Sequence, residues 1–522
     1  MKHHRGISLS AYHPLYHVHH LLALLFLFGI IFSSQLFFSG LDGQGTIILA
    51  AVLSGYMALN IGANDAGNNI GPLVGSAVIS LAGAMLLAAL FEMAGAFLAG
   101  NEVISTIKQG IIDREQLGGA QAVIKVMLSA VLASAIWLNI ATASGTPVST
   151  THTIVGGVLG AGITIGGPLV VNWKMLSTIT ASWLVSPLLG SAIAAFLLYL
   201  IKRNITYQPN MSGAAERVVP LLVGMMALTF TTYLLTKGLK ASWRVDLTTA
   251  LLCGASVGAG VFLIIKPTIM QRTALLPNTK SAVNRHFNLP LLMAAGLLSF
   301  AHGSNDVANA IGPLIAVKEA LALDQNVSQP GLSVWLLLVG AIGIPLGLVL
   351  YGKRLITTLG SEITELDQVR AFCIVTSVTI TVLLASQFGI PVSSTHTAVG
   401  AIFGIGFLRE ILKTNYAVTL EMIRRHKAGQ NQDEIDAFIQ HFDRSSFHEK
   451  GKLLKELNNS DKEMRISNKD RKSLNKLYHK ELVKRSTFIR IIMAWVITLP
   501  VTALLASLIY LLLDWSNIIF HE

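Results

Sequence analysis

The chain has 522 residues, of which 52% are hydrophobic and 13% charged, with a formal net charge of +11 at pH 7. A soluble domain carries roughly a quarter charged residues, so this composition excludes an ordinary soluble protein. Several apolar runs are longer than about 18 residues, enough to cross a hydrocarbon core as helices, and the sequence lacks the short alternating strands of a membrane barrel. We therefore predict an all-α polytopic membrane protein with about 10–12 transmembrane segments.

The charge and the cysteines exclude two further classes. In a membrane protein, excess Lys and Arg belong to cytoplasmic loops beside the lipid bilayer, so we expect no nucleic-acid partner. Cys253 and Cys373 lie in separate apolar runs and form no close pair, which supports neither a disulfide framework nor a zinc site.

Residues 1–44 combine a histidine-rich start with an apolar run at 21–38. No small-residue cleavage site follows directly, and the run is long for a signal peptide. We predict an extra first transmembrane helix that is retained, with its N-terminus in the cytoplasm. We interpret the histidines as a solvated leader, with metal binding as the alternative.

Residues 45–201 and 289–514 are two copies of one pattern. The segment GANDAGNNIGPL at 62–73 returns as GSNDVANAIGPL at 303–314, and PVSTTHTIVG at 147–156 returns as PVSSTHTAVG at 391–400. Residues 202–288 link the copies through two further apolar runs. If each PVS segment and the helix before it enter the membrane and return to the same side, each copy crosses the membrane an odd number of times. The copies are then inverted, with broken or re-entrant helices around a central site.

Residues 409–488 interrupt the second copy, where the first copy has only the short bridge ITIGGPLVVNW. The insertion is rich in Lys, Arg, Glu and Asp and cannot cross a bilayer. We predict a helical cytoplasmic segment, either a solvated spacer or a regulatory module. It separates residues 289–408 from a last transmembrane helix and the C-terminus at 489–522. The basic loops at 201–204, 266–285 and 352–355 then share the cytoplasmic side, and the C-terminus lies outside. The basic loop at 237–244 falls on the opposite side.

The first repeated motif places a carboxylate among amides, glycines and a proline. We expect Gly and Pro to interrupt the helix and free backbone carbonyls. A carboxylate inside a membrane span is costly and marks a functional site. Oxygen ligands suit hard cations rather than transition metals. The candidate cation ligands are Asn64, Asp65, Asn68, Asn305, Asp306 and Asn309. The alternative is polar helix packing through small residues.

The second repeated motif puts hydroxyls after a proline that can begin a helix. In the first helical turn, free N–H groups, the positive helix end and hydroxyl donors converge, which favours an anion. The candidate anion ligands are Ser149, Thr150, Thr151, Ser393, Ser394 and Thr395, with His152 and His396 as further candidates. The alternative is a capped helix start without a ligand. Carboxylates and a multivalent anion repel each other at low dielectric, so cations or protons must accompany the anion, which is symport.

These motifs resemble the signatures of the inorganic phosphate transporter (PiT) family over most of residues 45–514. The resemblance implies a secondary active transporter that imports phosphate across the inner membrane with Na⁺ or H⁺ and without a bound cofactor. It implies phosphate at the Ser/Thr hairpins and cations at the Asp/Asn motifs. Free phosphate and a metal–phosphate complex both stay open, as does a homodimer. The chain departs from the family pattern in its leader, its insertion and Gly67.

Two other classes stay open. One is a passive ion channel. The other is an intramembrane hydrolase that uses Asp65 or Asp306 with His152 or His396, although an enzyme has no need of the whole constellation twice. An enzyme is therefore not expected.

Overall fold

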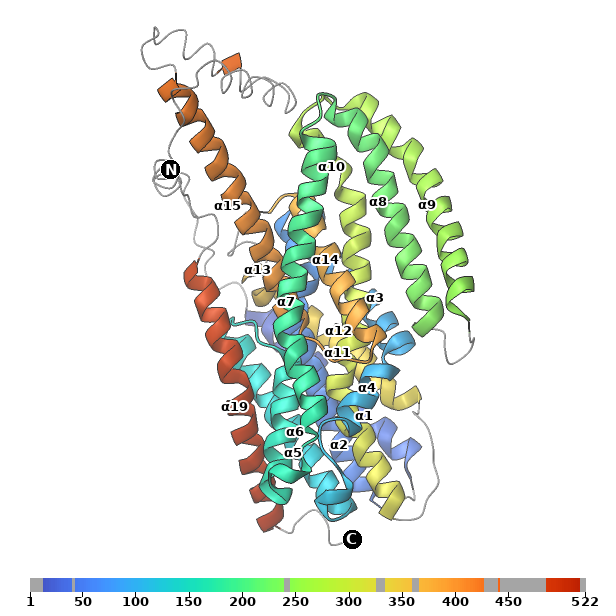
Figure 1. The fold of residues 1–522 in the computed structure, drawn as a ribbon. Helices are drawn as coiled ribbons and strands as arrows, with labels where there is room; N and C mark the ends of the chain where they lie inside the picture. Colours follow the sequence, from blue (N-terminus) through green and yellow to red (C-terminus); the bar gives the residue numbers. More distant parts are fainter. Residues whose placement is uncertain are drawn as a thin grey trace.

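The computed structural model describes residues 13–39, 43–238, 245–324, 334–358, 366–426, 440–441 and 485–516. Within these ranges the chain is helical and no β-strand occurs. Ten of the described helices are long and apolar enough to cross a membrane. Figure 1 shows them as an elongated bundle. The expected all-α polytopic fold is confirmed.

The helices follow the two copies in the same order. An extra helix, α1 (His13–Phe37), precedes the first copy. The first copy forms α2 (Gln44–Gly75), α3 (Leu81–Ala99), α4 (Asn101–Gln109), α5 (Ala120–Ser144), α6 (Thr150–Gly166) and α7 (Trp173–Ile201). The linker forms the turn η4 (Lys202–Thr206), α8 (Met211–Tyr233), α9 (Leu247–Leu275) and α10 (Lys280–His286). The second copy forms α11 (Asn288–Asp324), α12 (Val334–Tyr351), α13 (Lys353–Thr357), α14 (Gln368–Gln387), α15 (Ser394–His426) and α19 (Arg485–Ser516).

The helix interruption expected at the first motif is wrong. α2 continues through Pro72, and α11 continues through Pro313. The glycines serve close packing instead. A Cβ at Gly62 would lie 1.8 Å from a carbonyl oxygen of α12, and one at Gly303 would lie 2.1 Å from the carbonyl oxygen of Glu92 on α3. Side chains of this motif, not freed carbonyls, therefore supply its polar groups.

The chain does break at both PVS motifs, as expected. Between α5 and α6, Gly145 has φ 73°, and between α14 and α15, Gly389 has φ 65°. Glycine adopts this left-handed conformation at low cost because it has no Cβ. In Figure 1 the α5–α6 hairpin occupies the lower half of the bundle and α14–α15 the upper half. The two hairpins approach from opposite ends, as inverted copies predict.

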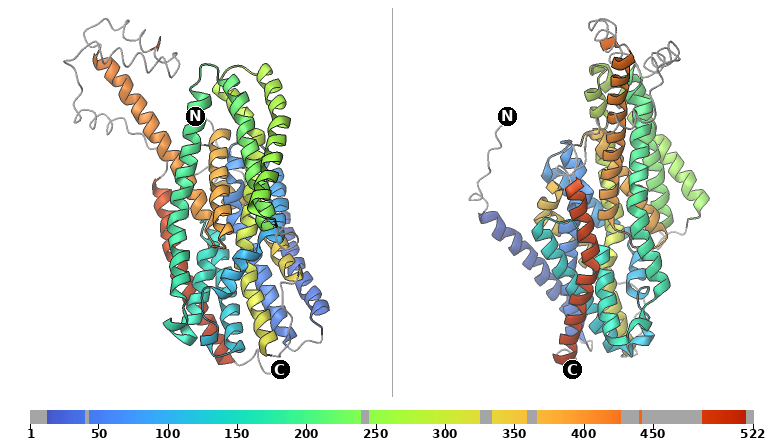
Figure 2. Two further views of the ribbon diagram at one scale, coloured as in Figure 1. Left: turned by 45° about the vertical axis from the view of Figure 1, so that its right-hand side comes forward. Right: turned by 60° about the vertical axis from the view of Figure 1, so that its left-hand side comes forward.

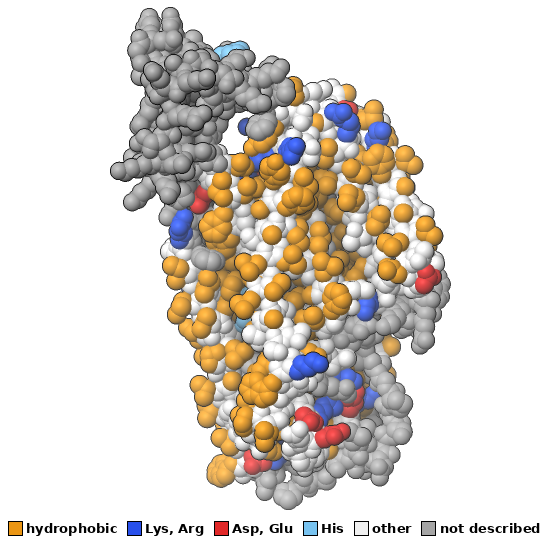
Figure 3. Space-filling model, viewed as in Figure 1, with side chains coloured by type: hydrophobic (Ala, Val, Ile, Leu, Met, Phe, Trp, Pro, Cys, Tyr) orange, Lys and Arg blue, Asp and Glu red, His pale blue; other side chains and the backbone are white. Residues whose placement is uncertain are grey.

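Two buried hydrophobic cores support the hairpins. One joins α2, α5, α6 and α11, and the other joins α3, α7, α8, α14 and α15. Outside these cores, large apolar side chains such as Leu184, Leu188 and Ile264 are exposed. Figure 3 shows hydrophobic side chains across the flank of the bundle, with charged side chains mainly toward its ends. This distribution fits a protein whose flank contacts lipid.

The charged insertion begins inside a helix. α15 continues past the predicted boundary at 408/409 and ends at His426. Figure 2 shows this helix leaving the body of the bundle at one end. Apart from residues 440–441, the stretch 427–484 lies outside the described residues, and so do residues 1–12 of the predicted leader.

Candidate functional site

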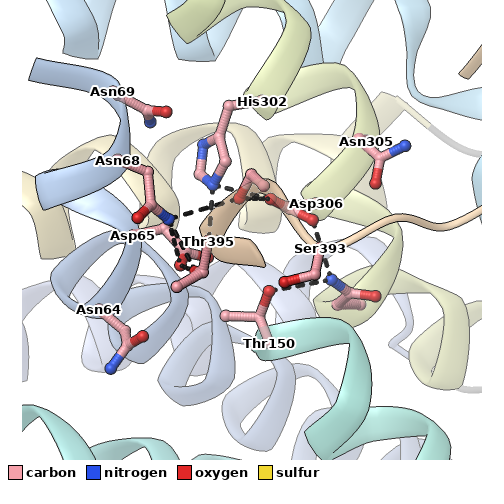
Figure 4. Close-up of polar contacts among 12 residues, drawn as sticks. Asn64, Asp65, Asn68, Asn69, Thr150, His302, Asn305, Asp306, Ser393 and Thr395 are labelled. Atoms are coloured by element: carbon pink, nitrogen blue, oxygen red, sulfur yellow. Dashed lines mark hydrogen bonds and ion pairs between the residues drawn. The ribbon is translucent and has the colours of Figure 1, made fainter. Parts of the chain in front are cut away.

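A buried pair of carboxylates and a histidine form the centre of the site (Figure 4). Asp65 on α2 and Asp306 on α11 are fully buried, and the His302 imidazole lies between them. Its Nε2 atom is 2.8 Å from Asp306 Oδ2 and 3.4 Å from Asp65 Oδ2. One ligand atom of each residue lies within 4.8 Å of the other two. The two copies of the first motif therefore meet at one place.

Glu92 of α3 adds a third buried carboxylate behind the histidine. Its Oε1 atom is 2.9 Å from His302 Nδ1 and also accepts a hydrogen bond from Asn69 Nδ2. Both ring nitrogens thus face carboxylate oxygens, and a neutral imidazole donates from only one of them. Either the imidazole is doubly protonated or one of the carboxyl groups holds a proton.

The motifs do not indicate Glu92 or His302. Glu92 stands alone in the apolar run 81–99, and an ionisable residue inside such a run is itself a functional signal. His302 directly precedes the second copy of the first motif, where the first copy has Ile61. Comparison of the two copies therefore does not indicate His302, because the first copy has no histidine at the equivalent position.

Asn68 and Asn309 occupy equivalent places, one helical turn after each aspartate. Asn68 Nδ2 donates to Asp65 Oδ1 at 2.9 Å, and Asn309 Nδ2 donates to Asp306 Oδ1 at 3.2 Å. Their amide oxygens are buried and have no hydrogen-bond partner among the described residues. An unpaired buried acceptor is costly. Two such oxygens beside two carboxylates form a donor set that suits a hard cation.

The second hairpin bonds directly to both aspartates. Thr395 Oγ1 donates to Asp65 Oδ1 at 2.9 Å, and Ser394 Oγ donates to Asp306 Oδ2 at 3.2 Å. These bonds place the candidate anion-binding hydroxyls of the second copy against the candidate cation ligands. The two predicted sites are adjacent at this hairpin.

The first hairpin bonds to Asn309 and to the second hairpin, as the second bonds to Asn68 and to the first, but among the described residues it does not bond to an aspartate. Thr150 Oγ1 and Thr151 Oγ1 each accept from Asn309 Nδ2, at 3.4 Å and 3.5 Å. Thr151 Oγ1 also donates to the carbonyl oxygen of Val392 at 3.1 Å. In the described part of the chain, neither hydroxyl bonds to a carboxylate. The hairpins touch each other across the centre, but only the second reaches the aspartates.

Ser149 and Ser393 begin the two hairpin helices as N-caps. Ser149 Oγ accepts from the backbone N–H of His152, and Ser393 Oγ accepts from that of His396, each at 3.1 Å. A cap of this kind satisfies one of the free N–H groups of the first turn. The candidate anion ligands therefore lie in two first turns that face each other across the centre.

Asn64 and Asn305 hold the extended parts of the hairpins. Asn64 Oδ1 accepts from the backbone N–H of Val148 at 3.2 Å, and Asn305 Oδ1 accepts from that of Val392 at 3.3 Å. Each amide nitrogen also donates to a hydroxyl at the end of the first helix of the same hairpin, Thr142 on α5 or Ser386 on α14. Each oxygen accepts a single hydrogen bond here and keeps a second lone pair, so a role as a cation ligand is compatible with its bond to the hairpin.

His152 and His396 lie in a column of four rings. The His152 ring is 3.7 Å from Trp183 of α7, the His396 ring is 3.7 Å from Trp495 of α19, and the two histidine rings are 4.4 Å apart, centroid to centroid. The column joins the hairpin and the last helix of one copy to those of the other. His152 Nε2 and both ring nitrogens of His396 are buried and have no hydrogen-bond partner among the described residues.

Each hairpin tip is also held by a short helix of the opposite copy. Thr106 Oγ1 of α4 donates to the carbonyl oxygen of Gly389 at 2.7 Å. Arg354 Nη1 of α13 donates to the carbonyl oxygen of Ala143. We call these two bonds the tip contacts. Because each joins one copy to the other, a hairpin cannot move away from the opposite copy without breaking its contact.

Comparisons with known proteins agree with this arrangement. A family model described as "Phosphate transporter family" matches residues 61–506. The chain is 46% identical over 507 residues to a Helicobacter pylori protein named "Putative phosphate permease", covering 95% of each chain. It is 37% identical over 390 residues to a Haemophilus influenzae protein of the same name, covering 73% of this chain and 92% of that one. A solved structure described as "The sodium-dependent phosphate transporter" matches with a TM-score of 0.72 and 28% identity, covering 90% of this chain and 99% of that chain.

Proposed function

Because the chain belongs to the phosphate transporter family, we propose that it is a symporter that imports inorganic phosphate together with Na⁺ or H⁺. The family is one of permeases, so the protein is a multi-pass membrane transporter and not an enzyme. The direction of transport and the coupling ion are part of the proposal.

The observation that carries the proposal is the excess of negative charge at the centre. Asp65, Glu92 and Asp306 contribute −3 when ionised, and a protonated His302 returns only +1. Uncompensated charge of this kind is costly in a low-dielectric interior. A phosphate anion cannot enter beside it until cations or protons neutralise the carboxylates. Phosphate entry then depends on cation binding, which is the physical basis of coupled transport.

Phosphate binding is assigned to the space between the two hairpin helix starts. Helix N-termini attract anions through their free N–H groups and the helix dipole. The hydroxyls that would add donors are Ser149, Thr150, Thr151, Ser393, Ser394 and Thr395. His152 and His396 are weaker candidates, because their rings already pack in the four-ring column.

Cation binding is assigned to Asp65, Asp306 and the two unpartnered amide oxygens of Asn68 and Asn309. All four groups offer oxygen atoms as ligands, which suit a hard cation such as Na⁺. The sodium-dependent neighbour supports Na⁺ as the coupling ion. The imidazole between carboxylates supports a proton, since the cluster must hold one. Cargo in the form of a metal–phosphate complex is a further version of the proposal.

We also propose that the protein lies in the inner membrane, with a cytoplasmic N-terminus and an outer C-terminus. The support is the excess of Lys and Arg in loops assigned to the cytoplasmic side. A homodimer is proposed as well, and the mass of the detergent-solubilised protein, measured by light scattering, tests it directly.

The experiment is uptake of radiolabelled phosphate into proteoliposomes under an imposed sodium gradient at fixed pH, repeated with a proton gradient without sodium. We expect accumulation above the external concentration under at least one gradient. Asp65→Asn and Asp306→Asn should abolish it, because Asn keeps the shape but removes the charge that offsets a cation. Cys253→Ser, at an exposed position on α9, serves as the control. Equilibration without accumulation would instead indicate a channel.

A further inference from the structure

Four basic side chains from separate elements converge at one end of the bundle. Lys202 begins η4 at the end of α7, Lys280 begins α10, Arg370 lies in the first turn of α14, and Arg409 lies on α15. Lys202 is within electrostatic reach of the other three. We call this set the basic cluster. In Figure 3 blue side chains gather at the end of the bundle where Figure 1 places α10.

The fold fixes this convergence. α10 packs against η4 and α14, and both α14 and α15 pack along α7. The basic side chains come from positions up to about two hundred residues apart, so neighbouring sequence does not explain their proximity. Arg409 is 7% exposed, which places its charge partly inside the protein rather than in open solvent.

The surroundings of Lys202 are strongly positive. Among the described residues, the charges that act on it most are the three other cations and one carboxylate, that of Asp367. Asp367 is itself engaged, because its Oδ2 atom lies 2.9 Å from Arg370 Nη2. Like charges in a half-buried place repel one another, and the repulsion destabilises the fold unless an anion compensates it. The position of Lys202 therefore favours a bound anion.

An apolar surface lies beside the basic cluster. Phe196 and Tyr199 on α7 are exposed, and so are Phe407 and Ile411 on α15. α7 and α15 pack side by side, and on each helix the exposed pair lies within two turns of a basic side chain of the cluster, Lys202 on one side and Arg409 on the other. A positive pocket next to exposed apolar and aromatic groups matches a molecule with an anionic head and hydrocarbon tails. Inorganic phosphate would contact only the basic side chains and leave the apolar groups uncovered.

We propose that the basic cluster binds the phosphodiester headgroup of an anionic phospholipid, whose acyl chains lie against the apolar surface of α7 and α15. Basic pockets between membrane helices at the cytoplasmic face bind such headgroups by charge attraction. The bound lipid would join the second hairpin, through α14 and α15, to α7 and α10. The site is separate from the central carboxylates, and its existence does not depend on the proposed transport function.

The test measures lipid binding to the full chain in detergent by native mass spectrometry, with phosphatidylglycerol and phosphatidylcholine as probes. We expect the parent protein to retain phosphatidylglycerol in preference to phosphatidylcholine. Lys202→Gln and Lys280→Gln should each weaken phosphatidylglycerol binding about fivefold, and together about 25-fold, because a basic side chain at a membrane surface contributes about 1 kcal/mol. Phosphatidylcholine binding should not change.

The matched control is Lys266→Gln, which removes the same charge from α9, where Lys266 lies over the Phe262 ring at 5.6 Å. Equal phosphatidylglycerol binding in this control and in the Lys202→Gln/Lys280→Gln variant would overturn the proposal. So would displacement of the lipid by millimolar inorganic phosphate, which would identify free phosphate as the occupant. If the double variant fails to fold, the single variants give the same comparison.

Discussion

The two equivalent threonines of the hairpins, Thr151 and Thr395, should respond differently to the same substitution. Val keeps the shape of Thr and deletes only the hydroxyl. Thr395→Val loses the bond to the Asp65 carboxylate at 2.9 Å, together with bonds from Asn68 Nδ2 and to the carbonyl oxygen of Val148. Thr151→Val loses only the counterparts of the last two, from Asn309 Nδ2 and to the neutral carbonyl oxygen of Val392 at 3.1 Å. The pair therefore isolates the effect of reaching the carboxylate.

The chemistry of the two bonds sets the expected magnitudes. A hydrogen bond to a charged group contributes about 1.5–3 kcal/mol, and a neutral one about 0.5–1.5 kcal/mol. Thr395→Val should therefore shift the cation concentration for half-maximal uptake roughly 10- to 150-fold. Thr151→Val should shift the same cation concentration by a smaller factor, roughly 2- to 13-fold. Both variants should also raise the apparent KM for phosphate, because each removes a proposed donor and because binding coupling is reciprocal.

The assay is initial phosphate uptake into proteoliposomes, measured against cation concentration at several phosphate concentrations. The ratio of the two cation shifts is the decisive quantity, since effects on folding or insertion would change the maximal rate instead. Equal shifts in the cation dependence of Thr151→Val and Thr395→Val would refute the reasoning. A larger shift in Thr151→Val would show that the first hairpin, not the second, approaches the cation.

A Gln side chain in place of His302 keeps one donor group but cannot contact Asp306 and Glu92 together. His302→Gln should therefore lower the rate of phosphate uptake at least about tenfold and alter its pH dependence at fixed sodium. An unchanged pH dependence would exclude His302 from coupling. Each tip contact should close one mouth of the site. Arg354→Gln and Thr106→Val should therefore shift the apparent KM for phosphate a few-fold and in opposite directions when uptake is measured from the two sides, and shifts of the same sign would contradict this. Replacing residues 414–484 with a short bridge of the sequence ITIGGPLVVNW should leave transport intact in oriented vesicles; loss of transport in correctly inserted protein would make the segment part of the machinery.

Local pattern was sufficient to predict the features that each copy contains. Apolar length indicated the membrane helices, and the prolines of the PVS motifs indicated the hairpin breaks. Duplication made Asp65 and Asp306 candidate partners. Their meeting required inverted copies, which follow from counting crossings between the repeats. These predictions needed no knowledge of which helices pack together.

The features that depend on packing could not be read from the motifs. Gly62 and Gly303 looked like helix breakers, yet they admit neighbouring backbones within otherwise continuous helices. Glu92 reaches the site only because α3 packs against α11. His302 has no counterpart in the first copy, so the central cluster is asymmetric where the sequence comparison predicted symmetry.

The most direct test of the central claim is the affinity of the purified protein for phosphate as a function of cation concentration, at fixed ionic strength. If the carboxylates around His302 must be neutralised before phosphate enters, the affinity should rise with Na⁺, or with H⁺ as the pH falls, and saturate. Asp65→Asn and Asp306→Asn should remove most of this dependence. Phosphate affinity that is independent of both cations in the parent protein would contradict coupling at this site.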